Sequence, residues 1–323
     1  MFVDELEGFA AEVSDPRCAA IAKRLATPLG VAVSGRRGVG RSTVAHALAR
    51  AGDLRGTIEL TTPSHADVGV YVLAEVVKPE DCDAIGAIGR PVLAVLNKAD
   101  LIATTESGRY PHGPTTAART RCARLSSRTG IPVEPMAGVL AVAALDGLVD
   151  DTLWAALQVL ADGHPVAAPL RRRLVDTLDM FGVTQAMAAI GRGATRAETG
   201  TLLRGLSCID EVLDKVEALG AQAHYQRVLD AVAELETLAV TDRRVGEFLS
   251  RDDTVVARMM AAVDVIEAVG MKVDHCDTAA AHLRRAVDWH RYRRGPVAGM
   301  HRACGADIVR GSLRLWTKVG GAM

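Results

Sequence analysis

Gly35-Arg-Arg-Gly-Val-Gly-Arg-Ser-Thr43 is the stretch that decides the fold, because it joins a strand pattern to a helix pattern. The apolar run of residues 29–34 precedes it, and the helical pattern of residues 43–50 follows it. In a phosphate-binding loop, backbone N–H groups and the N-terminal end of the following helix hold the phosphates. Glycine at the first and sixth positions and serine at the eighth match that motif. The alternative is an ordinary glycine-rich turn between a strand and a helix.

The seventh position of the motif departs from the pattern, because it is Arg41 where lysine is expected. Arginine keeps the charge that binds phosphate, but it is larger and planar and is not a neutral replacement. The change equally indicates a loop that no longer supports fast chemistry. Ser42 is placed to bind Mg²⁺ through its hydroxyl. The predicted phosphate-binding residues are Gly35, Arg36, Arg37, Gly38, Val39, Gly40, Arg41, Ser42 and Thr43, with Ser42 as the metal ligand.

A second motif, Asn97-Lys-Ala-Asp-Leu101, follows the apolar run of residues 91–97, about 60 residues after the loop. Asn-Lys-x-Asp at the end of a parallel strand is the guanine-specificity element of GTPases. Its aspartate accepts two N–H bonds from the guanine edge, which adenine does not offer. The turn after the last strand pattern, residues 131–138, supplies a backbone N–H to the guanine oxygen in such proteins. The predicted guanine-binding residues are Asn97, Lys98, Asp100, Ala137 and Gly138.

The composition indicates a chain of about two domains without a nucleic-acid partner. The chain has 323 residues with 49% hydrophobic residues, and its net charge is -1. The six cysteines are far apart and form no Cys-x-x-Cys pair, so they suggest neither a disulfide framework nor a zinc site. No apolar run is long enough for a transmembrane helix, and the N-terminus has no signal-peptide core. These features predict a cytoplasmic protein, with peripheral contact at a membrane surface left open.

The order of the patterns predicts an α/β P-loop G domain, with a mostly parallel sheet flanked by helices, followed by an all-α helical bundle. Strands are expected at residues 29–34, 57–62, 67–76, 91–97 and 131–138. Residues 140–160 and every segment after residue 170 are helical in pattern, including 170–181, 183–190, 195–206, 208–218 and 222–240. The predicted domains are 1–28, N-terminal helices that pack on the bundle; 29–163, the G domain; and 164–323, the bundle.

With these elements placed, the chain resembles the dynamin-like GTPases, in particular the compact actinobacterial ones. The resemblance depends on the loop of residues 35–43, on residues 91–100 and on Pro135-Met-Ala-Gly-Val-Leu-Ala141. It is looser over residues 176–183 and 204–212. It implies GTP or GDP with Mg²⁺ as ligands and a homo- or hetero-oligomer formed through the G domain or the bundle.

One element of that family is missing from the sequence. GTPases of this class carry Asp-x-x-Gly after a second apolar strand, where it supports Mg²⁺ and contacts the γ-phosphate. Between Ser42 and Asp67 there is room for one short strand only, and Thr61 or Thr62 is the candidate switch threonine. GTP hydrolysis depends on positioning and charge around the γ-phosphate, so this loss predicts slow hydrolysis while base recognition stays intact.

Three functions remain open at this point. The first is a guanine-nucleotide-binding dynamin-like G protein with weak or partner-dependent GTP hydrolysis. The second is a degenerate pseudo-GTPase that acts as a scaffold or regulatory subunit, paired with an active relative. The third is a membrane-associated mechanochemical protein. The short length of the chain and its lack of an apolar membrane-inserting tip argue against this function.

Each of the other polar groups has either a functional or a purely structural role. His46 is expected on the helix surface, and His65 and Asp67 either approach a phosphate or complete a turn. Residues 274–277 resemble a metal-ligand cluster, although adjacent residues point apart on a helix. The basic C-terminal region is typical of a site that binds a membrane surface or an acidic partner. The alternative is a helical bundle with its tryptophans in the core and its arginines exposed to solvent. Its members are Arg284, Arg285, Arg291, Arg293, Arg294, Arg302, Arg310, Arg314 and Lys318, with Trp289, Tyr292 and Trp316 between them.

Overall fold

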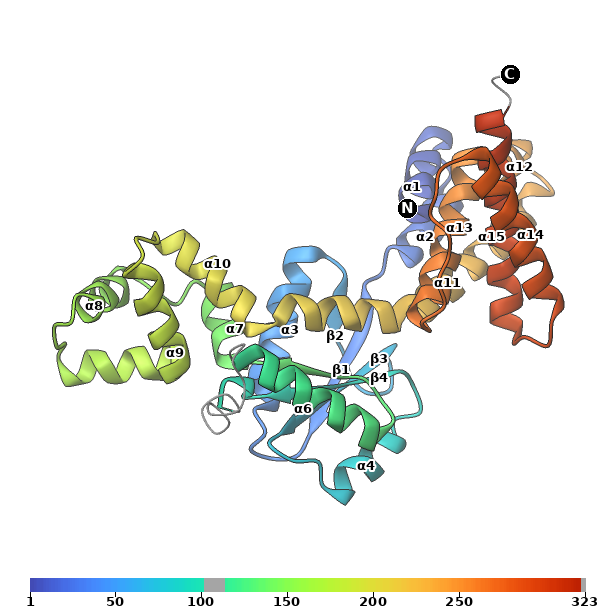
Figure 1. Ribbon diagram of the computed structural model, residues 1–323. Helices are drawn as coiled ribbons and strands as arrows, with labels where there is room; N and C mark the ends of the chain where they lie inside the picture. Colours follow the sequence, from blue (N-terminus) through green and yellow to red (C-terminus); the bar gives the residue numbers. More distant parts are fainter. Residues whose placement is uncertain (102–113, 321–323) are drawn as a thin grey trace. The chain divides into compact units, whose positions relative to one another are not determined.

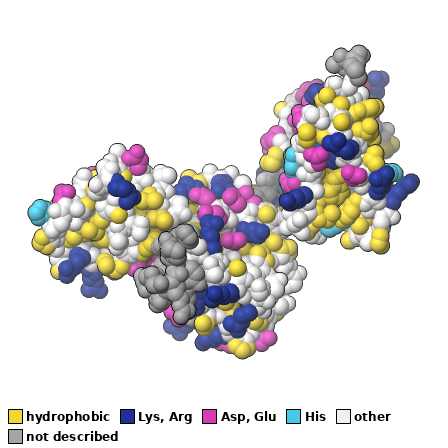
Figure 2. Space-filling model, in the orientation of Figure 1, with side chains coloured by type: hydrophobic (Ala, Val, Ile, Leu, Met, Phe, Trp, Pro, Cys, Tyr) yellow, Lys and Arg dark blue, Asp and Glu magenta, His cyan; other side chains and the backbone are white. Residues whose placement is uncertain are grey.

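The computed structural model describes residues 1–101 and 114–320, so the predicted loop at residues 104–116 lies largely outside the described residues. The chain forms two compact units, each described separately below (Figure 1). One unit holds residues Pro28–Leu219, and the other joins Met1–Thr27 to Gly220–Met323. Figure 2 shows basic and acidic side chains mixed on the visible face, in keeping with a net charge of -1. Over the described ranges, no helix is long and apolar enough to cross a membrane.

The unit of residues Pro28–Leu219 is built on a five-stranded, all-parallel sheet of order β2-β1-β3-β4-β5. Its apolar strands are buried on both faces, as parallel strands between helices require. This confirms the predicted α/β fold and the five strands. Their bounds are β1 Leu29–Gly35, β2 Ile58–Leu60, β3 Val68–Ala74, β4 Val92–Asn97 and β5 Val133–Met136.

The helices α3 (Arg41–Arg55), α4 (Pro79–Gly86), α6 (Pro114–Thr129) and α7 (Gly138–Leu145) accompany these strands. On one face of the sheet, a continuous core joins alternate residues of β3 and β4 to α4 and α6. The alternation is the period of two expected of strands, and it places the intervening residues on the opposite face. The members of this core include Tyr71, Leu73, Ala94, Leu96, Ile85, Cys122 and Leu125.

Three helices after the sheet form a separate core with α7: α8 (Asp151–Ala161), α9 (Ala168–Ile190) and α10 (Arg196–Ser207). The helix predicted over residues 140–160 is interrupted, because the Asp150 carboxylate accepts the Leu153 N–H and starts α8 anew. The two helices predicted at 170–181 and 183–190 are both present within α9, joined at a kink where Asp179 is non-helical.

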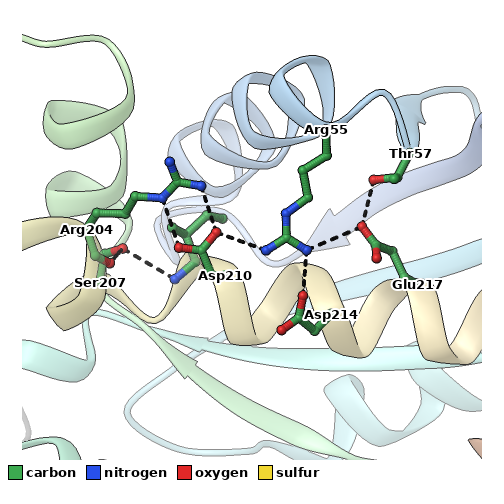
Figure 3. Close-up of polar contacts among 8 residues, drawn as sticks. Arg55, Thr57, Arg204, Ser207, Asp210, Asp214 and Glu217 are labelled. Carbon is green, nitrogen blue, oxygen red and sulfur yellow. Dashed lines mark hydrogen bonds and ion pairs between the residues drawn. The ribbon is translucent and has the colours of Figure 1, made fainter. Parts of the chain in front are cut away.

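α11 (Ile209–Ala239) is a single long helix where a break had been predicted between residues 218 and 222. Gly220 lies within it, so a glycine that signals a break in sequence is accommodated in the helix. The first turns of α11 are bound by ion pairs and a hydrogen bond to the end of α3 and the start of β2 (Figure 3). Arg55 pairs with Asp210 and Asp214, and the Thr57 hydroxyl donates to Glu217 at 2.6 Å.

The second unit is entirely helical in its described residues. Phe2, Phe9 and Phe248 meet in its core, and the rings of Phe9 and Phe248 stack with centroids 4.4 Å apart. The N-terminal helices therefore pack on the C-terminal bundle, as the sequence led us to expect. The helices are α1 (Phe2–Val13), α2 (Pro16–Leu25), α12 (Arg243–Ser250), α13 (Asp252–Ala268), α14 (Ala279–Arg294) and α15 (Gly299–Gly320), with the end of α11.

The compact units divide the chain at other positions than the predicted domain borders. Residues 164–219 belong to the same unit as the sheet, and the bundle of the second unit begins within α11 at Gly220. The physical reason is that α9 and α10 pack on α7, which directly follows the last strand.

We predict that Gly311→Ala lowers the free energy of unfolding by about 1–3 kcal/mol. A Cβ at residue 311 would lie 2.6 Å from the sulfur of Met259, a buried side chain of the facing helix α13. Gly246→Ala in α12 is the matched control, because a Cβ there meets only the Ala239 methyl at 3.8 Å. Helix propensity should make the control about 0.5–1 kcal/mol more stable. Urea denaturation followed by circular dichroism measures both, and equal curves for the two variants would contradict the prediction.

Candidate functional site

The glycine-rich loop connects the end of β1 to the start of α3, as its motif predicts. Gly35, Gly38 and Gly40 have φ angles of 144°, 89° and 86°, all in a range that disfavours other residues. A Cβ on Gly35 would lie 2.6 Å from the carbonyl oxygen of Val72 on the neighbouring strand. Gly40 is the N-cap of α3, so the loop leads directly into the helix N-terminus. These features fit the backbone cradle of a phosphate-binding loop.

Arg36 points away from this cradle and toward helix α4. Its Nε donates to Asp81 Oδ1 at 2.7 Å, and Asp81 is fully buried. The same carboxylate accepts the Tyr71 hydroxyl at 2.9 Å and the Lys78 backbone N–H at 2.8 Å. Arg36, predicted to bind phosphate, therefore holds the loop to α4 instead.

Arg37, Arg41 and Ser42 are exposed at the loop and at the first turn of α3. Within residues 1–101 and 114–320, neither guanidinium forms an ion pair, so both charges are available to an anion. Ser42 is the single predicted magnesium ligand. Over the same ranges, no group of three or more His, Cys, Asp or Glu side chains capable of holding a metal occurs.

Asn97 joins the loop to the turn after β5. Its Nδ2 donates to the Val39 carbonyl at 3.0 Å, and its Oδ1 accepts the Gly138 N–H at 3.0 Å. The side chain is 4% exposed. A Cβ on Gly138 would lie 2.8 Å from this Oδ1, and one on Gly40 would clash with the Nδ2. The sequence placed Asn97 at a base pocket, whereas its observed contacts connect three segments of the candidate site.

Asp100 is almost completely buried, with 8% of its surface exposed. Burial raises the pKa of its carboxyl above the ordinary value, and the neighbouring Asp179 carboxyl raises it further. Lys98, two residues earlier, is exposed and has a left-handed φ of 59°. The proximity of Asp179, from the middle of α9, was not predicted from the sequence.

The backbone N–H of Ala137, predicted to contact the guanine oxygen, is donated to the Ser207 carbonyl at 3.0 Å. Ala137 is itself buried. Since Gly138 donates to Asn97, both predicted N–H groups of this turn have partners within the chain. The junction of α10 and α11 thus contacts the edge of the candidate base site.

A small cavity beside Asp100 is lined by side chains from five parts of this unit. Ala99, Asp100 and Pro135 come from the ends of β4 and β5, and Ala118 comes from α6. Phe181 of α9 and the residues at the α10–α11 junction form the remaining wall. No sequence motif marks these helical residues, which are Phe181, Leu206 and Cys208.

The segment after β2 lies far from the loop. Leu60, the last residue of β2, pairs with Val31, four residues before Gly35, which corresponds to about 13 Å along the strand. The chain then turns back, and Asp67 accepts the Gly30 N–H at 2.8 Å. His65 and Asp67 therefore complete the turn before β3, one of the two alternatives that the sequence left open. Thr61 is likewise bound at the level of Val31, where its N–H donates to the Val31 carbonyl, so it does not lie at the loop in this structure.

The remaining candidates have partners of their own. His46 is exposed, as predicted, and its Nε2 lies 2.6 Å from Asp146. His275 pairs with Glu267, and Asp277 pairs with His282, so residues 274–277 do not converge on a point. In the basic C-terminal region, Trp289 is buried and Trp316 is 41% exposed.

Comparisons with known proteins leave the family of this chain open. A scan against protein-family models found none that matches, and a search of curated proteins found no similar sequence. The function is therefore inferred from the site itself.

Proposed function

We propose that this protein binds a guanine nucleotide and hydrolyses GTP weakly or only with a partner. The observation that carries the proposal is the pair of hydrogen bonds from Asn97 to Val39 and Gly138. They connect the phosphate loop to the Asn97–Asp100 segment, so one ligand with phosphates and a base would contact both. The dynamin-like resemblance agrees with this reading.

The phosphates of the nucleotide would be bound by backbone N–H groups and by positively charged side chains. The loop N–H groups and the N-terminus of α3 favour an anion. Arg41 and Arg37 supply positive charge, while Arg36 is bound to Asp81. The Ser42 hydroxyl would hold Mg²⁺, which neutralises charge on the phosphates when bound.

Hydrolysis should be slow because this chain offers little around a γ-phosphate. No Asp-x-x-Gly element stands at the end of β2 or β3, and the chain after β2 returns to the level of Gly30. Phosphoryl transfer depends almost entirely on positioning and electrostatic stabilisation. A partner that supplies these groups would raise the rate.

A second candidate function is favoured by the contacts of Ala137 and Asp100. The Ala137 N–H is bound to Ser207, and the Asp100 carboxyl lies beside Asp179. Both arrangements suit a degenerate pseudo-GTPase that acts as a scaffold or regulatory subunit of a complex.

Calorimetric titration with GTP, GDP and ATP, with and without Mg²⁺, separates the two functions. The first predicts micromolar binding of GTP and GDP, no comparable binding of ATP, and slow single-turnover hydrolysis. Absence of binding by all three nucleotides would favour the scaffold. Equal binding of ATP and GTP would show that Asp100 does not select the base.

Asp100→Asn tests the base assignment directly. The amide no longer accepts both guanine N–H groups, so preference should shift from GDP toward xanthosine diphosphate. Competition between the two diphosphates measures this shift, and Asp83→Asn on the surface of α4 is the control that should leave it unchanged. An unchanged preference in Asp100→Asn removes that residue from the base site.

A further inference from the structure

The predicted base site is covered by the chain's own helices. Phe181, Leu206 and Cys208 line the small cavity beside Asp100, and the Ser207 carbonyl occupies the Ala137 N–H. With Asp179 next to Asp100, every predicted guanine contact except Lys98 faces protein atoms. With 8% of its surface exposed, Asp100 is not reached by a base in this arrangement of the described residues.

The covering segment is bounded by two unusual backbone positions. Asp179 has φ 59° and ψ 170°, a region used almost solely by glycine. Cys208 has φ 59° and ψ 20°, a left-handed conformation at the start of α11. They are two of only five non-glycine residues with positive φ in the described chain. Hinges are a few loop or element-terminal residues that absorb large φ/ψ changes. Cys208 lies at a helix end, and Asp179 lies at the kink between the two helical segments of α9.

The segment between them is held at one end and packed along its length. The Arg204 guanidinium binds Asp210 of α11 through two hydrogen bonds of 2.8 Å. Arg55 binds the same Asp210 from α3, so the start of α11 is tied to the sheet (Figure 3). Gly182 of α9 lies directly against Leu140 of α7, since a Cβ there would clash with it. Displacement of α9 and α10 from the site would therefore break the bonds of Arg204 to Asp210 and the packing of Gly182 on Leu140.

We propose that residues 179–208, here called the base-site cover, close the guanine pocket and must be displaced from Asp100 and Ala137 when a guanine nucleotide binds. The inference rests on the proposed function. Asp179 is a positioning residue in this scheme, because its backbone strain works against closure. The apparent affinity for a ligand falls in proportion to the population of the open state. A phosphate-only ligand that never reaches Asp100 escapes this reduction.

The test compares GDP with inorganic tripolyphosphate by calorimetry on the full chain. Phe181→Ala removes a wall of the closed cavity, so GDP should bind about tenfold tighter while tripolyphosphate affinity stays the same. Met180→Ala, an exposed neighbour on α9, is the matched control and should change neither. Asp179→Gly relieves the backbone strain of the closed state, so GDP should bind about tenfold more weakly.

Thiol labelling gives a second readout that needs no nucleotide. Cys208 and Cys122 are both buried, but only Cys208 belongs to the cover, since Cys122 lies in the core on one face of the sheet. Iodoacetamide should modify Cys208 about tenfold faster in Phe181→Ala and more slowly in Asp179→Gly, with Cys122 unchanged.

The outcomes separate the two proposals. If tripolyphosphate and GDP bind but Phe181→Ala leaves GDP affinity unchanged or weakens it, the cover is wrong and the proposed function stands. If neither ligand binds the wild type or any variant, the proposed function fails and the cover fails with it.

Discussion

Replacing Asp81 by alanine is expected to lower the free energy of unfolding of the sheet-containing unit by about 3–5 kcal/mol. The carboxylate is fully buried and accepts hydrogen bonds from Arg36, Tyr71 and the Lys78 backbone. Alanine would leave the Arg36 guanidinium without its partner and the Tyr71 hydroxyl unpaired. The cost arises chiefly from these stranded groups. Urea denaturation followed by circular dichroism measures the loss.

Asp83→Ala is the matched control, because Asp83 is an exposed acid on the same helix. Its effect should stay within about 0.5 kcal/mol, as for most surface substitutions. Asp81→Asn should fall between the two, since the amide oxygen still accepts a hydrogen bond but carries no charge. Equal stability of Asp81→Ala and Asp83→Ala would show that Arg36 is not held by this contact.

The Asp81 network also makes stability depend on pH. Burial alone raises the pKa of this carboxyl, but Arg36, the Lys78 N–H and the Tyr71 hydroxyl outweigh it, and the pKa is lowered overall. The folded pKa is therefore below the unfolded value of about 3.9. The contribution is fully present above the unfolded pKa and is lost as pH falls through the folded pKa. In Asp81→Asn this part of the acid destabilisation should disappear.

The sheet and the loop were predictable because their signals are local. Continuous apolar runs at residues 29–34 and 91–97 are typical of strands buried on both faces, and both are strands. The glycines of the loop have the positive φ angles that their motif implies. Glycines, apolar runs and helix-start residues each determine the conformation of only a few neighbouring residues. A single sequence is therefore enough to predict the elements that depend on them.

The contacts at the site that the sequence did not predict join residues far apart in the chain, and no local sequence pattern indicates them. Ala137 and Ser207 are 70 residues apart, and the bond between them is made by backbone atoms that every residue possesses. Asp179 was expected within ordinary helix, and its place beside Asp100 depends on how α9 packs against α7. Arg36 looked like a phosphate ligand, because the sequence does not show that a buried aspartate 45 residues later binds it.

Asn97→Ala is the second large effect we expect, and it tests whether the site is one unit. The substitution removes the donor to the Val39 carbonyl and the acceptor of the Gly138 N–H, both in buried surroundings. Each of the two groups left unpaired costs about 1–3 kcal/mol, so the free energy of unfolding should fall by about 2–6 kcal/mol. Thermal and urea denaturation of the purified chain measure this loss.

The same substitution should weaken tripolyphosphate binding, although Asn97 is not expected to touch a phosphate. Val39 lies between Gly38 and Gly40, so the hydrogen bond from Asn97 fixes the part of the loop where the backbone N–H groups turn inward. Asn97→Asp is the control for the two halves of the bridge: its carboxylate still accepts the Gly138 N–H but donates nothing to Val39. If the loop is set by the Val39 contact, Asn97→Asp should lose phosphate affinity as Asn97→Ala does while retaining more stability. If both variants keep wild-type affinity, the loop holds its shape through its glycines alone, and Asn97 serves only to join β4 to the turn after β5.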